Sequence, residues 1–230
     1  LFMFLALGVP LGVMASVHAG RWPDLGVRFL AILGMGLPAF WLGLMVQIVF
    51  FGQLGWFPAV GRIDPDIAPP TQITGLYLVD SLITGNLEAF GSSLHHILLP
   101  AAVLALARFG VTIRFVRAGM LEALSSDYVR TARAKGLSQR VVVRGHALRN
   151  ALIPVLTMTG LQFGWLLGGT VLVETVFSWP GLGVYAIQSI GSLDFTATMA
   201  VTLLLAVVFV LVNLLVDFLY GVVDPRISLK

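Results

Sequence analysis

The sequence has no cysteine and few charged residues. Asp, Glu, Lys and Arg together make up 11% of its 230 residues. Without cysteine the chain has no disulfide framework, no catalytic thiol and no Cys-ligated metal site. Soluble domains carry about 25% charged residues, and the low charge here accompanies a hydrophobic content of 58%. These values exclude an ordinary soluble domain and predict an all-α polytopic membrane protein.

Lysine is almost absent, which bears on nucleotide binding. The phosphate-binding loop of ATPases requires a Gly-Lys pair followed by Ser or Thr. The only lysines are Lys135, which follows Ala134, and Lys230, which follows Leu229. We therefore expect no nucleotide-binding site and no cofactor in this chain.

Histidines and acidic residues are too scattered to suggest a catalytic or metal site. The adjacent His95 and His96 would point ~100° apart on a helix. Asp64 and Asp66 are flanked by prolines and are predicted to be solvated in a loop. The sequence shows no spaced Ser, His and Asp set. We predict no catalytic residue and no metal ligand.

Long apolar segments dominate the chain. A helix rises ~1.5 Å per residue, so about 20 apolar residues cross a hydrocarbon core of ~30 Å. Pro38 lies inside the second segment and is expected to kink it or to let it line a cavity. The predicted spans are 1–17, 29–51, 97–117, 151–173 and 196–220.

Basic residues give these spans an orientation. Every Lys and Arg except Arg62 lies in 18–28, in 108–149 or in the C-terminal tail. The positive-inside rule places these regions in the cytoplasm and the loops 52–96 and 174–195 outside. The C-terminus is then cytoplasmic and the N-terminus lies outside at the start of a helix. We expect a first helix to be missing before residue 1.

The cytoplasmic loop 121–150 is the polar, basic part of the chain. Ser126 or Asp127 can begin a helix, and Gly136 is suited to the left-handed conformation that ends one. A second short helix is predicted to begin at Ser138. This segment is too polar to cross a bilayer, so it is predicted to lie at the membrane surface as a docking element.

The residues of this loop resemble a known motif. Arg130-Thr131-Ala132, followed after three residues by Gly136, is similar to the "EAA" loop of bacterial ABC importer permeases, with Arg and Thr replacing Glu and the first Ala. The strings YVRTARAKGLS and HALRNALIPV resemble the dipeptide, oligopeptide and nickel branch, in which the proline is displaced, here to Pro154. PAFWLG, LGWFPA, ETVFSWPGLG and DPRI extend the resemblance over essentially the whole chain.

This resemblance implies a type I ABC importer transmembrane fold in the bacterial inner membrane. It also implies a second permease subunit, two ABC ATPase subunits and an extracytoplasmic solute-binding protein as partners, and no nucleic acid. A basic loop that only obeys topology or touches anionic lipid is the alternative role for the docking element. The predicted ATPase-docking residues are Asp127, Tyr128, Arg130, Thr131, Ala132, Arg133, Lys135, Gly136 and Leu137.

Other residues are candidates for packing or for the transport path. Gly160, Gly164 and Gly168 form a small-residue ridge, either for packing within the subunit or for contact with a second permease or the path. Arg108 lies inside the third span, either lining a cavity or anchoring a helix end. Glu174 is assigned either to the path or to a structural pair. Candidates for an external gate or binding-protein contact are Trp179, Pro180 and Gly181.

The favoured function is that of a permease subunit, without enzymatic activity, that forms a path for di- or oligopeptides with a second permease and couples it to cytoplasmic ATPases. The same architecture importing nickel or glutathione is the near alternative. A carrier that needs no ATPase, or a membrane enzyme, is the alternative of another class. The sequence does not decide the solute, and it does not decide whether the permease pair is homodimeric or heterodimeric.

Overall fold

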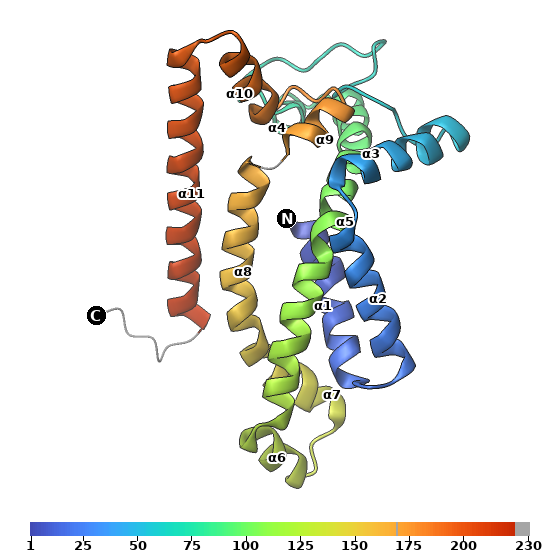
Figure 1. Ribbon diagram of the computed structural model, residues 1–230, viewed down its shortest axis with the longest axis vertical. Coiled ribbons are helices and arrows are strands. Elements are labelled where there is room, and N and C mark those ends of the chain that lie inside the picture. The colour runs from blue at the N-terminus through green and yellow to red at the C-terminus, as the bar shows by residue number, and fades with distance from the viewer. Residues whose placement is uncertain (169, 224–230) are drawn as a thin grey trace. The chain divides into compact units, whose positions relative to one another are not determined.

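The computed structural model describes residues 1–168 and 170–223. Within these ranges the chain forms helices joined by turns and loops, and contains no strand. Two of the helices, η1 and η2, are π-helical. The elements in order are α1 Phe2–Val17, α2 Trp22–Gly36, α3 Ala39–Gln47, η1 Ile48–Gln53, α4 Tyr77–Ile83, α5 Leu87–Ser125, α6 Asp127–Ala134, α7 Gln139–Val141, η2 Val142–Ala147, α8 Leu148–Gly168, α9 Val171–Val176, α10 Leu182–Gly191 and α11 Phe195–Val223 (Figure 1).

Apolar length sets which helices can cross a membrane. Among the described residues, α5 and the part of α11 from Phe195 to Phe218 are long and apolar enough on their own. The number rises to four if two bent pairs are each taken as one span, one of α2 with α3 and η1, and one that bends at Pro154. These helices, with the shorter apolar α1, lie over the five predicted spans. The helix α5, from Leu87 to Ser125, extends beyond the predicted span 97–117 at both ends.

Pro38 interrupts the second predicted span. The helix α2 stops at Gly36 and α3 starts at Ala39, with Pro38 in an extended conformation at φ −60° and ψ 132°. Proline has no N–H to donate within a helix and restricts the residue before it. Two helices therefore replace the single kinked helix that the sequence suggested.

The chain divides into two compact units. The first contains residues 1–36, 105–167 and 202–223, and the second contains 37–104 and 168–201. In the first unit, Phe4, Val27 and Ile113 are buried where α1 and α2 pack on α5. The helices α1 and α5 lie so close that a Cβ on Gly12 would be 2.7 Å from the Val116 Cβ. Small residues therefore let α1 and α5 pack backbone to backbone.

An ion pair also holds the first unit together. The Arg117 guanidinium on α5 donates two hydrogen bonds to the Asp24 carboxylate, each 2.7 Å long. Asp24 is 1% exposed and also accepts a hydrogen bond from the Gly20 N–H. A buried carboxylate needs such partners, because desolvation without them is costly. This pair fixes the start of α2 against α5.

The loops of the second unit pack around an apolar cluster. Leu99 and Val103 of α5 pack with Val173 and Phe177. The Gln47 side-chain amide donates hydrogen bonds to the Ala59 and Val176 carbonyls. These contacts bring the two loops predicted to lie outside, 52–96 and 174–195, into one body.

Candidate functional site

The helix α6 has the local structure that its sequence predicts. Its N-cap is Ser126, which is extended. At the other end Gly136 has φ +77°, which confirms the predicted left-handed glycine. The Gly136 N–H donates to the Arg133 carbonyl at 2.9 Å, and the Leu137 N–H donates to the Ala132 carbonyl at 3.3 Å. These two bonds form a complete Schellman motif. The next helix, α7, has Ser138 as its N-cap, which confirms the predicted second start.

One face of α6 is anchored in the core of the first unit. Val129 is 0% exposed and Ala132 is 6% exposed. Both pack in a single cluster with side chains of three other elements. These are Val116, Met120 and Ala123 of α5, Val142, Val143 and Ala147 of η2, and Ala151 and Val155 of α8. The complete burial of a valine side chain stabilises by about 1.5–3 kcal/mol. Ala132, although one of the predicted docking residues, therefore anchors the helix and presents no side chain to a partner.

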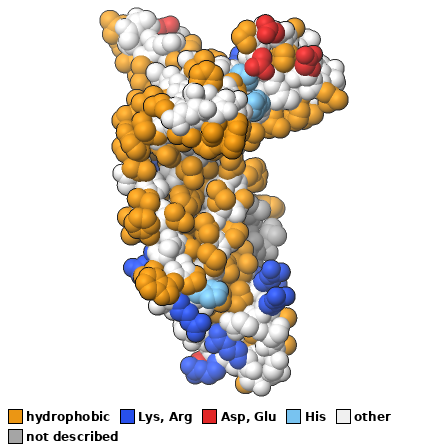
Figure 2. Space-filling model, turned by 90° about the vertical axis from the view of Figure 1, so that its right-hand side faces the viewer, with side chains coloured by type: hydrophobic (Ala, Val, Ile, Leu, Met, Phe, Trp, Pro, Cys, Tyr) orange, Lys and Arg blue, Asp and Glu red, His pale blue; other side chains and the backbone are white. Residues whose placement is uncertain are grey.

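The other face of α6 is exposed and basic. Tyr128 and Leu137 are 42% and 40% exposed, beside solvent-facing Arg130, Arg133 and Lys135. Asp127 and Arg130 form an ion pair of 3.1 Å, but their side chains are 93% and 79% exposed. Exposed pairs contribute little to stability. Lys and Arg side chains gather around the α6 and α7 end of this unit (Figure 2). The surface offers cations, one aromatic ring and one aliphatic side chain to a partner.

Arg108 is stacked on an aromatic ring. Its guanidinium carbon lies 2.9 Å from the ring centroid of Trp165 on α8. This cation–π contact gives the charge a partner inside an apolar segment. The sequence singled out Arg108 without finding Trp165, because the residues are 57 positions apart and only the pairing of α5 with α8 brings them together.

The glycine ridge of α8 faces α11 of the same chain. A Cβ on Gly160 would lie 3.2 Å from the Val216 Cγ2, and a Cβ on Gly164 would overlap the Phe209 ring. The surroundings of Gly168 lie outside the described residues. For the first two glycines the geometry therefore favours packing within the subunit.

Glu174 organises the loop of the predicted gate. Its carboxylate accepts hydrogen bonds from the Thr170 hydroxyl at 2.6 Å and from the Val184 N–H at 2.8 Å. A side chain on Gly181 would overlap this carboxylate. Val184 is in the first turn of α10, where N–H groups lack helical partners. Glu174 thus caps α10 from outside that helix, where the helix dipole favours a negative charge.

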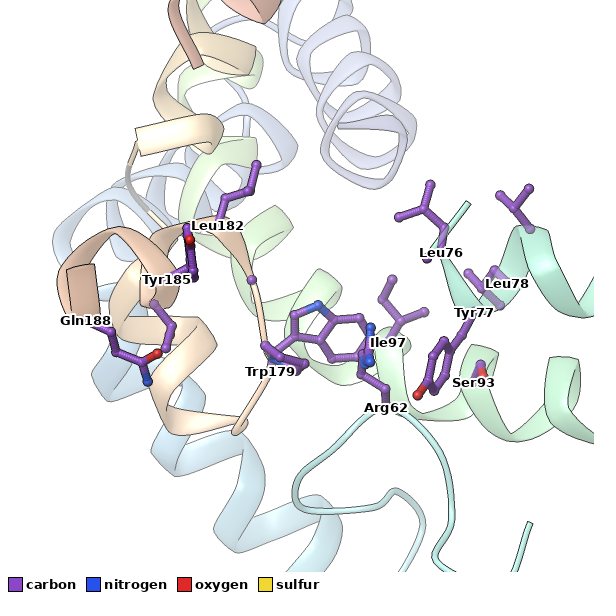
Figure 3. A pocket seen from close by; sticks show the side chains of 15 residues that line it. Arg62, Leu76, Tyr77, Leu78, Ser93, Ile97, Trp179, Leu182, Tyr185 and Gln188 are labelled. Atoms are coloured by element: carbon purple, nitrogen blue, oxygen red, sulfur yellow. The ribbon is translucent and has the colours of Figure 1, made fainter. Parts of the chain in front are cut away.

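The predicted gate residues Trp179, Pro180 and Gly181 form one wall of a pocket of about 740 Å³ in the second unit (Figure 3). Another part of the wall contains Arg62 and Tyr77, with the Arg62 guanidinium carbon 4.0 Å from the Tyr77 ring centroid. Sequence reasoning did not identify this part. One signal was available, because Arg62 is the single Lys or Arg within the two loops predicted to lie outside.

Asp64 lies in a loop as predicted, and its side chain is 46% exposed, but it also has partners that the sequence did not indicate. Its carboxylate accepts a hydrogen bond from the Ser92 hydroxyl at 2.6 Å and lies 3.8 Å from the His96 ring. Ser92 and His96 are on α5, and loop folding brings Asp64 against them. Over residues 1–168 and 170–223, no group of three or more His, Cys, Asp or Glu side chains could hold a metal ion.

The sequence was compared with protein families and curated proteins. The family described as "Binding-protein-dependent transport system inner membrane component" matches residues 8–229. The chain is 49% identical to the probable D,D-dipeptide transport system permease protein DdpB of Escherichia coli (strain K12), over 99% of this chain and 67% of that protein. It is 45% identical to the dipeptide transport system permease protein DppB of Alkalihalophilus pseudofirmus, over 96% of this chain and 66% of that protein.

A third relative is the glutathione transport system permease protein GsiC of Salmonella choleraesuis. It is 41% identical over 97% of this chain and 63% of that protein. The chain thus spans about two thirds of the length of the curated relatives it matches.

Among solved structures, the inward facing MetNI methionine ABC transporter matches with a TM-score of 0.68 at 17% identity, over 97% of this chain and 88% of that chain. The likeness shows the fold, which is the type I ABC importer transmembrane fold. The protein is a multi-pass membrane protein of a transport family. The chain belongs to the binding-protein-dependent transport system inner membrane components, as the residues of its cytoplasmic loop predicted.

Proposed function

We propose that this chain is the permease subunit of an ATP-driven importer of di- or oligopeptides. Two of the relatives described above are named for dipeptide transport. A relative named for glutathione transport makes that tripeptide the second candidate solute. The permease would lie in the bacterial inner membrane with α6 and the C-terminus in the cytoplasm, as the distribution of basic residues favours.

In this proposal the chain pairs with a second permease, and two ATPases that bind ATP and Mg²⁺ dock beneath the pair. An extracytoplasmic binding protein delivers the peptide. The observation that carries the proposal is the structure of α6. Its inner face is locked to α5, η2 and α8 by Val129 and Ala132, while its outer face is exposed.

This arrangement suits mechanical coupling. When the ATPase pair closes, a groove that holds the outer face of α6 would displace the helix. The buried face of α6 packs on α5 and α8, so these helices would move with it as a rigid body. The Schellman turn at Gly136 fixes the end of α6 and lets the chain reverse toward α7. Membrane attachment by the basic face is the competing role for the same surface.

A pair of substitutions at Gly136 tests the coupling role. Gly136→Val should lower ATP-driven peptide uptake by the assembled importer at least about tenfold, because a β-branched residue resists a φ of +77°. Gly136→Asn is the matched control, because asparagine tolerates this conformation, and it should retain most of the uptake. The level of the chain in the membrane and the amount of co-purified ATPase are measured for both variants.

Normal uptake by Gly136→Val, at a normal membrane level, would contradict the proposed role of α6. Uptake that persists when the ATPases are absent would favour the self-contained carrier. Uptake that depends on anionic lipid in the reconstituted membrane, with the co-purified ATPase unchanged, would favour lipid attachment.

A further inference from the structure

The pocket of the second unit has the features of a binding site for a small amphipathic molecule. It has a volume of about 740 Å³ and mostly apolar walls, among them Leu76, Ile97, Trp179 and Leu182. In the view of Figure 3, Arg62 is drawn between Trp179 and Tyr77, and the Arg62 guanidinium carbon lies 4.0 Å from the Tyr77 ring centroid. Ligand sites are typically concave and apolar, with a few polar groups that fix orientation.

Two carboxylates accept hydrogen bonds from the segments that form the walls of this pocket. Asp80 is 0% exposed and accepts hydrogen bonds from the Thr74 N–H and hydroxyl and from the Gly75 N–H. These bonds shape the turn that leads into Leu76 and Tyr77. Glu174 holds the other wall through Val184 and Gly181. Both walls are therefore fixed in place, which lowers the entropy lost when a ligand binds.

Two polar groups of the pocket have no hydrogen-bonded or ion-paired partner among the described residues. Ser93 lines the pocket and is 2% exposed, and its hydroxyl has no hydrogen-bond partner. Buried hydroxyls are normally paired. Arg62 touches the Tyr77 ring but makes no ion pair with any carboxylate of the described residues. Asp80 and Glu174 are already engaged by hydrogen bonds within their own walls.

We propose that this pocket binds the carboxyl terminus of a short peptide, with Arg62 pairing with the carboxylate and the apolar wall around Trp179 receiving the last side chain. A guanidinium forms two parallel hydrogen bonds with a carboxylate, the strongest such pairing available to a side chain. Ser93 would add a hydroxyl donor. The substrate class rests on the proposed function, while the requirement for an anion beside an apolar group rests on the pocket itself.

Direct binding without transport tests this site. The importer is reconstituted in nanodiscs without its binding protein and without ATP, and equilibrium dialysis measures the binding of radiolabelled Ala-Phe and of its C-terminal amide. Ala-Phe should bind saturably and at least about tenfold more tightly than the amide, because only the acid pairs with Arg62. Arg62→Gln should remove this preference, and Arg62→Lys should keep part of it.

Arg21→Gln is the matched control, because Arg21 is exposed and lies outside this pocket. It should bind both ligands as the unmodified chain does. Ser93→Ala should weaken the binding of Ala-Phe about threefold without changing the fold of α5.

Equal binding of acid and amide, or no saturable binding, would overturn the proposal. The proposal would also be overturned if Arg62→Gln weakened binding of the solute-binding protein but left the affinity for Ala-Phe unchanged. Arg62 would then pair with a carboxylate side chain of the binding protein and not with the peptide. ATP-driven uptake of Ala-Phe, measured separately, tests the importer function. Uptake of Ala-Phe without binding at this pocket would contradict the proposed binding site but not the proposed importer function.

Discussion

The helix α6 of the first unit and the loops of the second unit use their charged side chains in opposite ways. In the first, the charged residues of α6 face solvent, and its apolar residues Val129 and Ala132 hold the helix in place. In the second, the carboxylates of Asp80 and Glu174 turn inward and hold loops in place. Exposed charges remain available to a partner, whereas carboxylates that accept hydrogen bonds from nearby loops shape the backbone around them. Charge therefore serves recognition on α6 and architecture in the loops.

A substitution of Asp24 is the strongest test of this comparison, because its carboxylate is buried in the first unit. Asp24→Ala should destabilise that unit by about 3–5 kcal/mol, since it leaves Arg117 without its partner. The Arg117 side chain is 24% exposed, so the lower end of this range is expected. Thermal unfolding in nanodiscs measures the effect. Asp127→Ala removes a carboxylate that is 93% exposed and should change stability by less than about 1 kcal/mol. Equal effects would remove the distinction between inward and outward charge.

Glu174→Ala should have the next largest effect. Loss of a helix cap typically costs about 0.5–2 kcal/mol, and here the hydrogen bond to the Val184 N–H is lost. Hydrogen exchange should therefore quicken at Val184 and through the first turn of α10, while α6 is unaffected. Glu174→Gln is the matched control, because it keeps the acceptor oxygen and loses the charge. Unchanged exchange in Glu174→Ala would show that α10 needs no cap.

Substitution of Asp80 should have the smallest effect on stability, and this effect should depend on pH. Burial raises the pKa of the Asp80 carboxyl, but hydrogen bonds from the Thr74 hydroxyl and the Thr74 and Gly75 N–H groups outweigh it, so the pKa lies below its ordinary value of about 4. A lowered pKa adds stability above the unfolded pKa, and this contribution is lost as the pH falls through the folded pKa. The stability difference between the unmodified chain and Asp80→Asn should therefore be constant at neutral pH and should shrink below about pH 4. A difference that grows on acidification would contradict this assignment.

Local patterns predicted the helix ends of the docking element well. The left-handed Gly136 and the start at Ser138 depend on neighbouring residues, and both appear in the structure. The burial of Ala132 was not predicted, because exposed and buried alanines are alike in a helical sequence. The stacking of Arg108 on Trp165 also depends on helix pairing that no local pattern encodes.

The pocket of the second unit shows the same limit. The sequence singled out one wall, Trp179, Pro180 and Gly181, through the family resemblance of its segment. The other wall comes from residues more than 80 positions earlier, and Ser93 and Tyr77 carry no local sign of a site. A charge count singled out Arg62, but only the folded loops show that it faces Tyr77.

The cap that Glu174 provides has a consequence for the order in which this region folds. The N-cap residue of α10 is Gly181, which has no side chain with which to begin a helix. The missing acceptor arrives from α9, ten residues upstream of Val184. A peptide of residues 178–191 should therefore be nearly unstructured in water. In the intact chain α10 should form only after α9 has docked. Because α9 is synthesised before α10, the Glu174 carboxylate is already present when α10 begins to fold.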